Sequence, residues 1–98
     1  MYDKLYSKDM AFEFDERKSL SNKEKHGIDF VEAQILWKDE HRLEVPARTV
    51  TESRFVVIGE VKSKVWAAVV TYRDENTRII SVRRARKREV ELYESDRI

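Results

Sequence analysis

Three β-rich runs that follow one another closely constrain the fold of this 98-residue chain more than any other feature. The runs are Arg54–Gly59, Val65–Tyr72 and Thr77–Arg83, and they are rich in the β-branched residues that pleated sheets favour. The segments between them, Glu60–Lys64 and Asp74–Asn76, are typical of hairpin turns. Because strands joined by hairpins run in opposite directions, the three runs predict an antiparallel sheet.

The segment before these strands predicts a short strand and a surface helix. Ala11–Asp15 alternates apolar and polar residues, which is typical of a strand. Asp15 is a favourable N-cap for a helix over Glu16–His26, and Gly27 is a common residue just past a helix end. Since Leu20 is the only large apolar residue of this helix, we expect the helix to lie on the surface and to pack through a narrow contact.

A second helix is predicted to begin at Asp29. Asp29 and Glu32 have the spacing of a capping box, with Asp in place of the usual Ser or Thr. Ile28 and Ala33 have the spacing of a hydrophobic staple. We expect this helix to pack on the core through an apolar face made of Phe30, Ala33, Leu36 and Trp37.

The remaining elements complete an α+β fold. His41–Val45 predicts an edge strand that stops at Pro46, and Arg84–Glu94 predicts a closing helix. The expected order is β-α-α-β-β-β-β-α, an antiparallel sheet with two N-terminal helices and one C-terminal helix. Residues 1–10 show no clear period and are expected to form a leader, while residues 11–98 form a single domain.

The composition narrows the possible classes of function. Hydrophobic residues make up 41% and charged residues 40% of the chain, as in a globular domain whose surface is solvated or faces a partner. The absence of cysteine excludes disulfides, zinc–thiolate sites and thiol nucleophiles. No segment approaches the roughly 18 apolar residues of a membrane span, and no signal peptide is recognisable, so we expect a cytoplasmic location. With no metal-ligand spacing and no Gly-rich phosphate loop, we expect no metal or cofactor.

Positive charge is concentrated towards the end of the chain. Residues 61–98 carry 10 basic and 6 acidic side chains, a net charge of +4, whereas residues 1–60 carry 10 basic and 13 acidic side chains, a net charge of −3. Between Arg78 and Arg88 there are six basic residues and no acidic one. A polyanion is the natural partner of such a surface.

The closing helix has two distinct faces. At about 100° per residue, one arc carries Ala85, Val90, Leu92 and Tyr93. Glu89 falls within this arc, and because a carboxylate on a packed face needs a cationic partner, we expect it to pair with an arginine of the sheet. The opposite arc is expected to be a solvated or partner-docking surface, with Arg84, Lys87 and Arg88.

Arginines gather on or beside the predicted strands, at Arg54, Arg73, Arg78 and Arg83. Guanidinium groups can hold a phosphate by two parallel hydrogen bonds and can stabilise the negative charge of a phosphoryl transition state. Any one of these arginines is more often a partner for a carboxylate at the sheet edge. For the group, next to a basic helix, phosphate recognition is at least as well favoured.

Four other side chains have both a chemical and a structural interpretation. Lys25 and His26 could transfer protons, or they could simply complement the helix dipole before Gly27. Trp66 and Tyr72 could stack on nucleobases if exposed, but their alternating strand positions favour the core.

Short pieces of sequence occur along the chain in a fixed order, at Phe12-Glu13-Phe14-Asp15, Lys18, Asn22, Lys25-His26-Gly27-Ile28, Phe30, Ala33, Asp39, 54–59, 78–85, Glu89 and Tyr93. With these pieces in this order, the chain resembles the BrnT toxins of bacterial type II toxin–antitoxin systems. Each piece is weak alone, but the KHG segment together with RIIS-x-R-x-A is fairly specific. The chain departs from the usual family pattern at Phe14, Val82 and Arg86, where the family tends to have Trp, Ala and Thr.

The resemblance implies a RelE-like fold and a metal-independent endoribonuclease that arrests translation. It also implies a BrnA-like antitoxin that covers the toxin in a heterotetramer or larger complex and supplies the contacts with DNA. The chemistry expected is attack of the ribose 2′-hydroxyl on the adjacent phosphate, which needs a base, an acid and a cation.

The candidate site residues receive the following roles. Arg78 and Arg83 would stabilise charge, while Arg54 and Arg73 would position the substrate. Lys25 or His26 would transfer protons, Glu89 would orient an arginine, and Tyr93 would be an acid or a packing residue. The alternative is a module without catalytic activity that binds nucleic acid or protein through its basic C-terminal helix.

Overall fold

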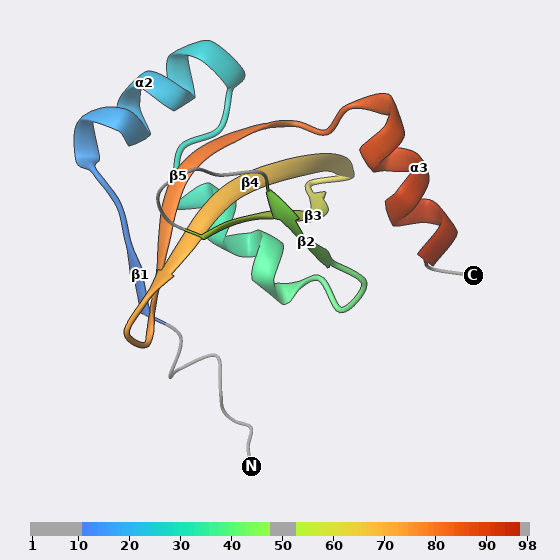
Figure 1. Cartoon of the computed structure of the whole chain (residues 1–98). Helices are drawn as coiled ribbons and strands as arrows, with labels where there is room; N and C mark the ends of the chain where they lie inside the picture. The colour runs from blue at the N-terminus through green and yellow to red at the C-terminus, as the bar shows by residue number, and fades with distance from the viewer. Residues whose placement is uncertain (1–10, 48–52, 97–98) are drawn as a thin grey trace.

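The computed structural model of the chain describes residues 11–47 and 53–96, so the leader predicted for residues 1–10 lies outside the described part. The described elements form an α+β fold built on a five-stranded sheet (Figure 1). In chain order they are β1 (Ala11–Glu13), α2 (Glu16–His26), the 3₁₀ helix η1 (Glu32–Lys38), β2 (Leu43–Ala47), β3 (Arg54–Val61), β4 (Lys64–Arg73), β5 (Asn76–Arg84) and α3 (Lys87–Asp96).

The sheet is mixed, and the prediction of a purely antiparallel sheet is wrong. The strand order is β1-β5-β4-β3-β2, and the neighbours from β5 to β2 run antiparallel. β1 instead pairs with β5 in parallel, with Phe12 beside Thr77. Because parallel partners are not joined by a tight turn, nothing in the local sequence around β1 indicates its direction in the sheet.

Hydrophobic clusters lie on both faces of the sheet. The larger cluster packs the segment around η1 against the sheet, with Ile28, Phe30, Ala33, Leu36, Val57, Val61, Trp66, Ala68, Val70, Ile79 and Val82. The smaller cluster joins Ile58 and Ala67 of the opposite face to Tyr93 of α3. Figure 1 shows α3 at one end of the sheet. We call the face that carries Ile58 and Ala67 the α3 face.

α2 has well-defined caps, but its only large apolar residue faces solvent. Asp15 Oδ1 accepts hydrogen bonds from the backbone N–H groups of Arg17 and Lys18 at 2.8 and 3.1 Å, and Gly27 ends the helix at φ 85°. Leu20 is 68% exposed, so the expected contact through this residue is wrong.

Two buried polar side chains fix α2 instead. Asn22 Nδ2 donates to the carbonyls of Ile28 and Val82, both at 2.8 Å, and its Oδ1 accepts from the backbone N–H of Val82 at 3.2 Å. Ser19 Oγ accepts from the backbone N–H of Phe30 at 2.9 Å. These side chains satisfy backbone groups that burial would otherwise leave unpaired, so a helix with little apolar surface is still held in place.

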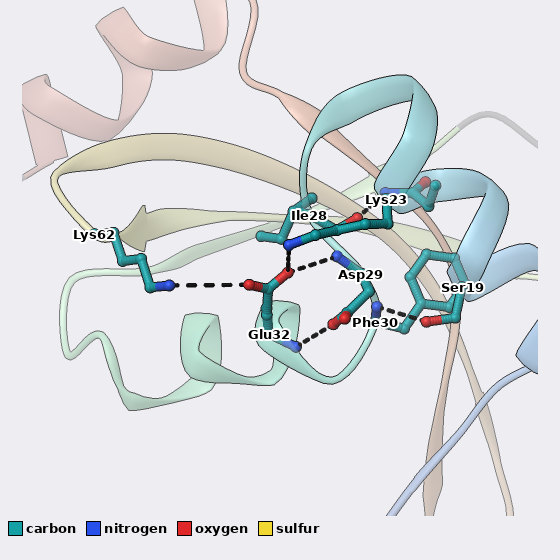
Figure 2. Close-up of polar contacts among 8 residues, drawn as sticks. Ser19, Lys23, Ile28, Asp29, Phe30, Glu32 and Lys62 are labelled. Atoms are coloured by element: carbon teal, nitrogen blue, oxygen red, sulfur yellow. Dashed lines mark hydrogen bonds and ion pairs between the residues drawn. The ribbon is translucent and has the colours of Figure 1, made fainter.

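The segment after α2 begins with the predicted capping box. Asp29 Oδ1 accepts from the backbone N–H of Glu32 at 2.7 Å, and Glu32 Oε1 accepts from that of Asp29 at 3.0 Å (Figure 2). The helix that follows is a 3₁₀ helix, not the α-helix expected from Asp29. It has 7 residues, which is longer than the roughly 3–4 residues that 3₁₀ runs usually reach. Its predicted apolar residues Ala33 and Leu36 are buried.

The predicted element boundaries differ from the structure by a few residues, most clearly at Pro46 and Arg84. β2 continues through Pro46, which pairs with Phe55. Proline is tolerated here because β2 is at the edge of the described sheet, where a missing N–H need not break a ladder. β5 extends to Arg84, so α3 begins at Lys87 instead of Arg84.

The β3–β4 turn has two non-glycine residues in the left-handed region. Lys62 has φ 52° and Ser63 has φ 70°, as in a type I′ turn, where Asn-Gly is favoured. We expect the double variant Lys62→Asn/Ser63→Gly to raise the free energy of unfolding by about 1 kcal/mol, because it relieves this backbone strain. Urea unfolding would measure the change, and a variant no more stable than the wild type would contradict the prediction.

Candidate nucleic-acid interface and active site

The four predicted phosphate-binding arginines lie on the α3 face of the sheet. Arg83 pairs with Ala67, which belongs to the cluster beneath α3. Thr71 points to the same face as Ala67 and pairs with Arg78. Arg54 points to this face as well, because side chains alternate along β3 and Arg54 is four positions before Ile58. Arg73 does so because it is two positions after Thr71 on β4. Residues from three strands therefore share one face, and Arg78 and Arg83, which are five positions apart, do so because the register shifts between Val69 and Val70.

Arg78 of β5 is next to β1 and pairs with the carboxylate of Glu13 on that strand. Its Nη1 lies 3.0 Å from Glu13 Oε1, and Arg73 Nη1 lies 3.9 Å from the same oxygen. Asn76 Nδ2 donates to Glu13 Oε2 at 3.0 Å. The hydrogen bonds from Asn76 and Arg78 lower the pKa of Glu13. Two arginines thus share one ionised carboxylate, and the group keeps a positive charge.

A row of half-buried side chains runs across the strands of this face and reaches β5 between Arg78 and Arg83. In the strand register its members stand side by side, and they are Val45, Val56, Val69 and Ser81. The β4 partners of Arg78 and Arg83 are at positions 71 and 67, which places the two arginines about 13 Å apart along the sheet. The face therefore offers a mostly apolar floor with an arginine on either side.

Arg83 forms the ion pair with Glu89 that the helix wheel predicts. Nη1 lies 2.8 Å from Oε1 and Nη2 lies 2.9 Å from Oε2, so the pair is bidentate. Glu89 Oε1 also accepts from the backbone N–H of Arg86 at 2.8 Å, just before α3 begins. The hydrogen bond from Arg83 lowers the pKa of Glu89, and the same bond raises the pKa of Arg83. Arg83 is thus held ionised in one orientation, with further N–H groups for a phosphate.

This ion pair makes stability sensitive to acid. The pKa of Glu89 is lowered from its ordinary 4.5, so the contribution of the pair is complete above that value and is lost as pH falls through the folded-state pKa. We expect Glu89→Gln to be less stable than the wild type at neutral pH and to lose less stability between about pH 5 and pH 3. Urea unfolding across this range would show it, whereas parallel pH profiles would contradict it.

Tyr93 anchors α3 to the sheet. Its ring is 1% exposed and packs against Ile58 and Ala67. Its hydroxyl donates to Asp39 Oδ2 at 2.6 Å. The ring of Tyr93 is therefore part of the core, and its hydroxyl is already hydrogen-bonded within the fold.

Asp39 is a residue to which sequence reasoning gave no role. Besides Tyr93, it accepts from the backbone N–H groups of His41 at 2.9 Å and Glu60 at 2.8 Å. Burial raises the pKa of Asp39, but the hydrogen bonds from Tyr93, His41 and Glu60 outweigh it, so the pKa is lowered. Gly59 leaves the necessary room, because a Cβ there would lie 3.2 Å from Asp39 Oδ2. An aspartate just after a helix is a turn signal, but its partners on β3 and α3 are not visible locally.

Lys25 and His26 are not brought into contact with the arginines. Both are exposed at the C-terminal end of α2. The residues that follow them line a pocket with Trp66, which pairs with Arg84. Lys25 and His26 therefore lie at the same end of the sheet as Arg83 but on its other face, and in the described part of the chain no hydrogen bond or ion pair links them to Arg83.

The two aromatic candidates differ in burial. Trp66 is 7% exposed and its Nε1 donates to the carbonyl of Val61 at 3.3 Å, which confirms the core interpretation. Tyr72 is 42% exposed, so the core interpretation is wrong for this residue. It lies near the end of β4, where its ring packs beside Phe55 and its hydroxyl donates to Glu44. Burial and this hydrogen bond raise the pKa of Tyr72.

The predicted docking residues are at the surface. Arg84, Lys87 and Arg88 are all exposed. The guanidinium of Arg84 lies 5.5 Å from the ring centroid of Trp66, on the face opposite α3. Leu92 is 43% exposed, so its predicted place on the packed arc of α3 is wrong.

Within residues 11–47 and 53–96, no group of three or more His, Asp or Glu side chains that could hold a metal ion comes together. No helix in those ranges is long and apolar enough to cross a membrane.

Comparison with known proteins agrees with the resemblance seen in the sequence. A family model described as the ribonuclease toxin BrnT of type II toxin–antitoxin systems matches residues 14–89, a range that includes all four arginines and Glu89. None of the curated proteins compared with the chain matches it. Because the family match spans well over half of its length, the chain belongs to the BrnT family of ribonuclease toxins of type II toxin–antitoxin systems.

Proposed function

We propose that this chain is a metal-independent endoribonuclease with a RelE-like fold that arrests translation by cleaving RNA in the cytoplasm. The ribose 2′-oxygen forms a bond with the adjacent phosphorus, and the bond from phosphorus to the 5′-oxygen breaks. A base takes the proton of the 2′-hydroxyl, and an acid gives one to the leaving oxygen. The products carry a 2′,3′-cyclic phosphate and a 5′-hydroxyl.

The observation that carries this proposal is the arginine-bearing α3 face of the sheet. Arg83, oriented by Glu89, and Arg78, beside Glu13, present cations at either side of an apolar floor. Fixed cations aimed at a phosphate stabilise the charge that develops during attack without having to reorganise. Phosphates of one RNA strand would lie on these arginines, with the strand crossing the valine row.

The remaining roles follow from position. Arg54 and Arg73 contact phosphates away from the reacting one and position the strand. Lys25 or His26 transfers protons to the RNA. The RNA strand would pass round the end of the sheet that carries Arg83 on one face and these two residues on the other. Tyr93 holds α3, and through it Glu89, because its hydroxyl is already bonded to Asp39.

The partner is proposed to be a BrnA-like antitoxin, which neutralises the toxin in a heterotetramer or larger complex. A protein antitoxin is implied by the type II family itself. Arg84, Lys87 and Arg88, which are exposed at the end of β5 and the start of α3, form part of the docking surface. DNA is contacted only through the antitoxin.

Metal independence is tested directly with purified protein. We expect the protein to cleave RNA at an undiminished rate in the presence of EDTA and to leave 2′,3′-cyclic phosphate ends. End-labelled RNA and analysis of the product termini would measure both. Cleavage abolished by EDTA and restored by Mg²⁺ would overturn the metal-independent mechanism but leave the family assignment intact.

A second candidate function is binding without catalysis. It is favoured by the exposure of Arg84, Lys87 and Arg88, which suits electrostatic docking to a polyanion. Tight RNA binding that weakens steeply with salt, with no product after long incubation, would support this alternative.

A further inference from the structure

A pocket on the face of the sheet opposite the α3 face has no part in the proposed reaction. Its volume is about 180 Å³, and it is lined by Gly27, Ile28, Glu32, Val61, Lys62, Lys64 and Trp66. Ile28 and Val61 are both 3% exposed and give it an aliphatic floor. Typical small-molecule sites measure roughly 300–1,000 Å³, so this pocket has the size for one side chain of a larger partner.

The rim of this pocket is positively charged. Lys23 lies 2.8 Å from Glu32 Oε1 and Lys62 lies 3.9 Å from Oε2, reaching the carboxylate from α2 and from the β3–β4 turn (Figure 2). Lys64 lines the pocket as well, and Arg84 covers the indole that forms one wall. Among the described residues neither Lys64 nor Arg84 has an ion pair. Two cations thus pair with the one carboxylate of the pocket and two further cations, Lys64 and Arg84, stand at its walls, so the rim favours an anionic group.

One of these cations, Lys62, lies in a turn whose backbone is strained. Lys62 and the next residue, Ser63, both have positive φ, where a type I′ turn favours Asn-Gly. Strain of this kind concentrates at functional positions, because elsewhere a less costly residue can replace it. The turn therefore places a lysine beside the pocket at the expense of stability.

The walls of the pocket suit a protein segment better than RNA. Trp66 is 7% exposed, its Nε1 is bonded to Val61 and Arg84 lies over its ring, so it offers no surface on which a base could stack. Glu32 Oε2 can accept an N–H group of a peptide, a donor that the RNA backbone does not offer. An aliphatic floor with a cationic rim matches an apolar side chain next to an acidic one.

We propose that this pocket docks the antitoxin, by taking one apolar side chain from a segment that also carries an aspartate or glutamate. The apolar group packs on Ile28 and Val61, and the carboxylate pairs with Lys62 and Lys64. This inference rests on the antitoxin partner in the proposed function. Because the pocket is on the opposite face from Arg78 and Arg83, docking there attaches the antitoxin without itself covering the arginines.

The test uses the full-length toxin and the protein encoded by the gene beside it, with affinity measured by calorimetry at low and high salt. We expect Lys62→Glu/Lys64→Glu to weaken antitoxin binding by about tenfold or more, while the unbound variant cleaves a short RNA at the wild-type rate. Lys62→Asn/Ser63→Gly should bind several-fold more weakly even though it melts at a higher temperature, so loss of folding cannot explain its effect. Lys38→Glu, an exposed charge change outside the pocket, should bind as the wild type does.

Each outcome separates this inference from the proposed function. Antitoxin affinity equal to the wild type in both pocket variants would overturn the pocket assignment and leave the toxin function intact. Weaker RNA binding with unchanged antitoxin affinity would mean an RNA subsite and would also overturn it. Failure of the wild-type toxin to bind the antitoxin would overturn both this inference and the partner in the proposed function.

Discussion

Replacing Arg83 by alanine is expected to lower the rate of RNA cleavage by about 10²–10³-fold, the usual cost of removing one fixed group that stabilises developing charge. Arg83 is held by two hydrogen bonds from its guanidinium to Glu89, so its orientation is set before RNA arrives. Arg83→Lys should recover little activity, because an ammonium keeps the charge but cannot reproduce the fork geometry. Single-turnover cleavage of a labelled RNA would measure the loss.

Controls must separate chemistry from folding, because Arg83→Ala leaves the Glu89 carboxylate partly buried without its partner. Arg83→Gln/Glu89→Gln removes both charges and should fold more stably than Arg83→Ala while remaining as inactive. Lys38→Ala, an exposed change away from the arginines, should cleave normally. Wild-type cleavage by a folded Arg83→Ala protein would remove Arg83 from the catalytic site.

Replacing Tyr93 by alanine is expected to lower the free energy of unfolding by about 3–5 kcal/mol, the range for emptying a large aromatic site in a core. The ring is 1% exposed against Ile58 and Ala67, and its hydroxyl bonds to Asp39. α3 would then lose its main anchor, and Glu89 would no longer be held against Arg83. Urea unfolding would give the free energy, and cleavage assays on the remaining folded protein would show a parallel loss.

Tyr93→Phe separates packing from acid chemistry. It keeps the ring and removes only the hydrogen bond to Asp39, so we expect a loss of about 1–2 kcal/mol in stability and near wild-type cleavage. A folded Tyr93→Phe protein that has lost cleavage would instead establish the hydroxyl as the acid.

The features that could be predicted from the sequence are those with a local cause. The strands β3 to β5 follow from β-branched runs between turn residues, and the capping box follows from the spacing of Asp29 and Glu32. The ion pair of Glu89 follows from a carboxylate on an otherwise apolar helix face. In each case the residues that determine the structure lie within a few positions of one another.

The features that could not be predicted depend on partners that are remote in the sequence. The apolar content of α2 directs attention to Leu20, yet Asn22 holds the helix by binding the backbone of Ile28 and Val82. Tyr72 alternates with core residues, but it is close to the end of β4 and remains exposed. Of the candidate site, Arg78 and Arg83 are five positions apart, so strict alternation predicts opposite faces, and they share a face because the register shifts between Val69 and Val70. Lys25 and His26 are on the other face because α2 crosses there.

The parallel pairing of β1 with β5 has a consequence for the synthesis of the toxin. β5 carries Arg78 and Arg83, and α3 carries Glu89, so these two arginines and the carboxylate that orients Arg83 are translated after the other strands. β1 cannot find its partner, and Arg83 cannot be oriented, until these last segments have left the ribosome. Under the proposed function, a nascent chain therefore has no oriented Arg83 with which to cleave RNA until β5 and α3 have emerged from the ribosome.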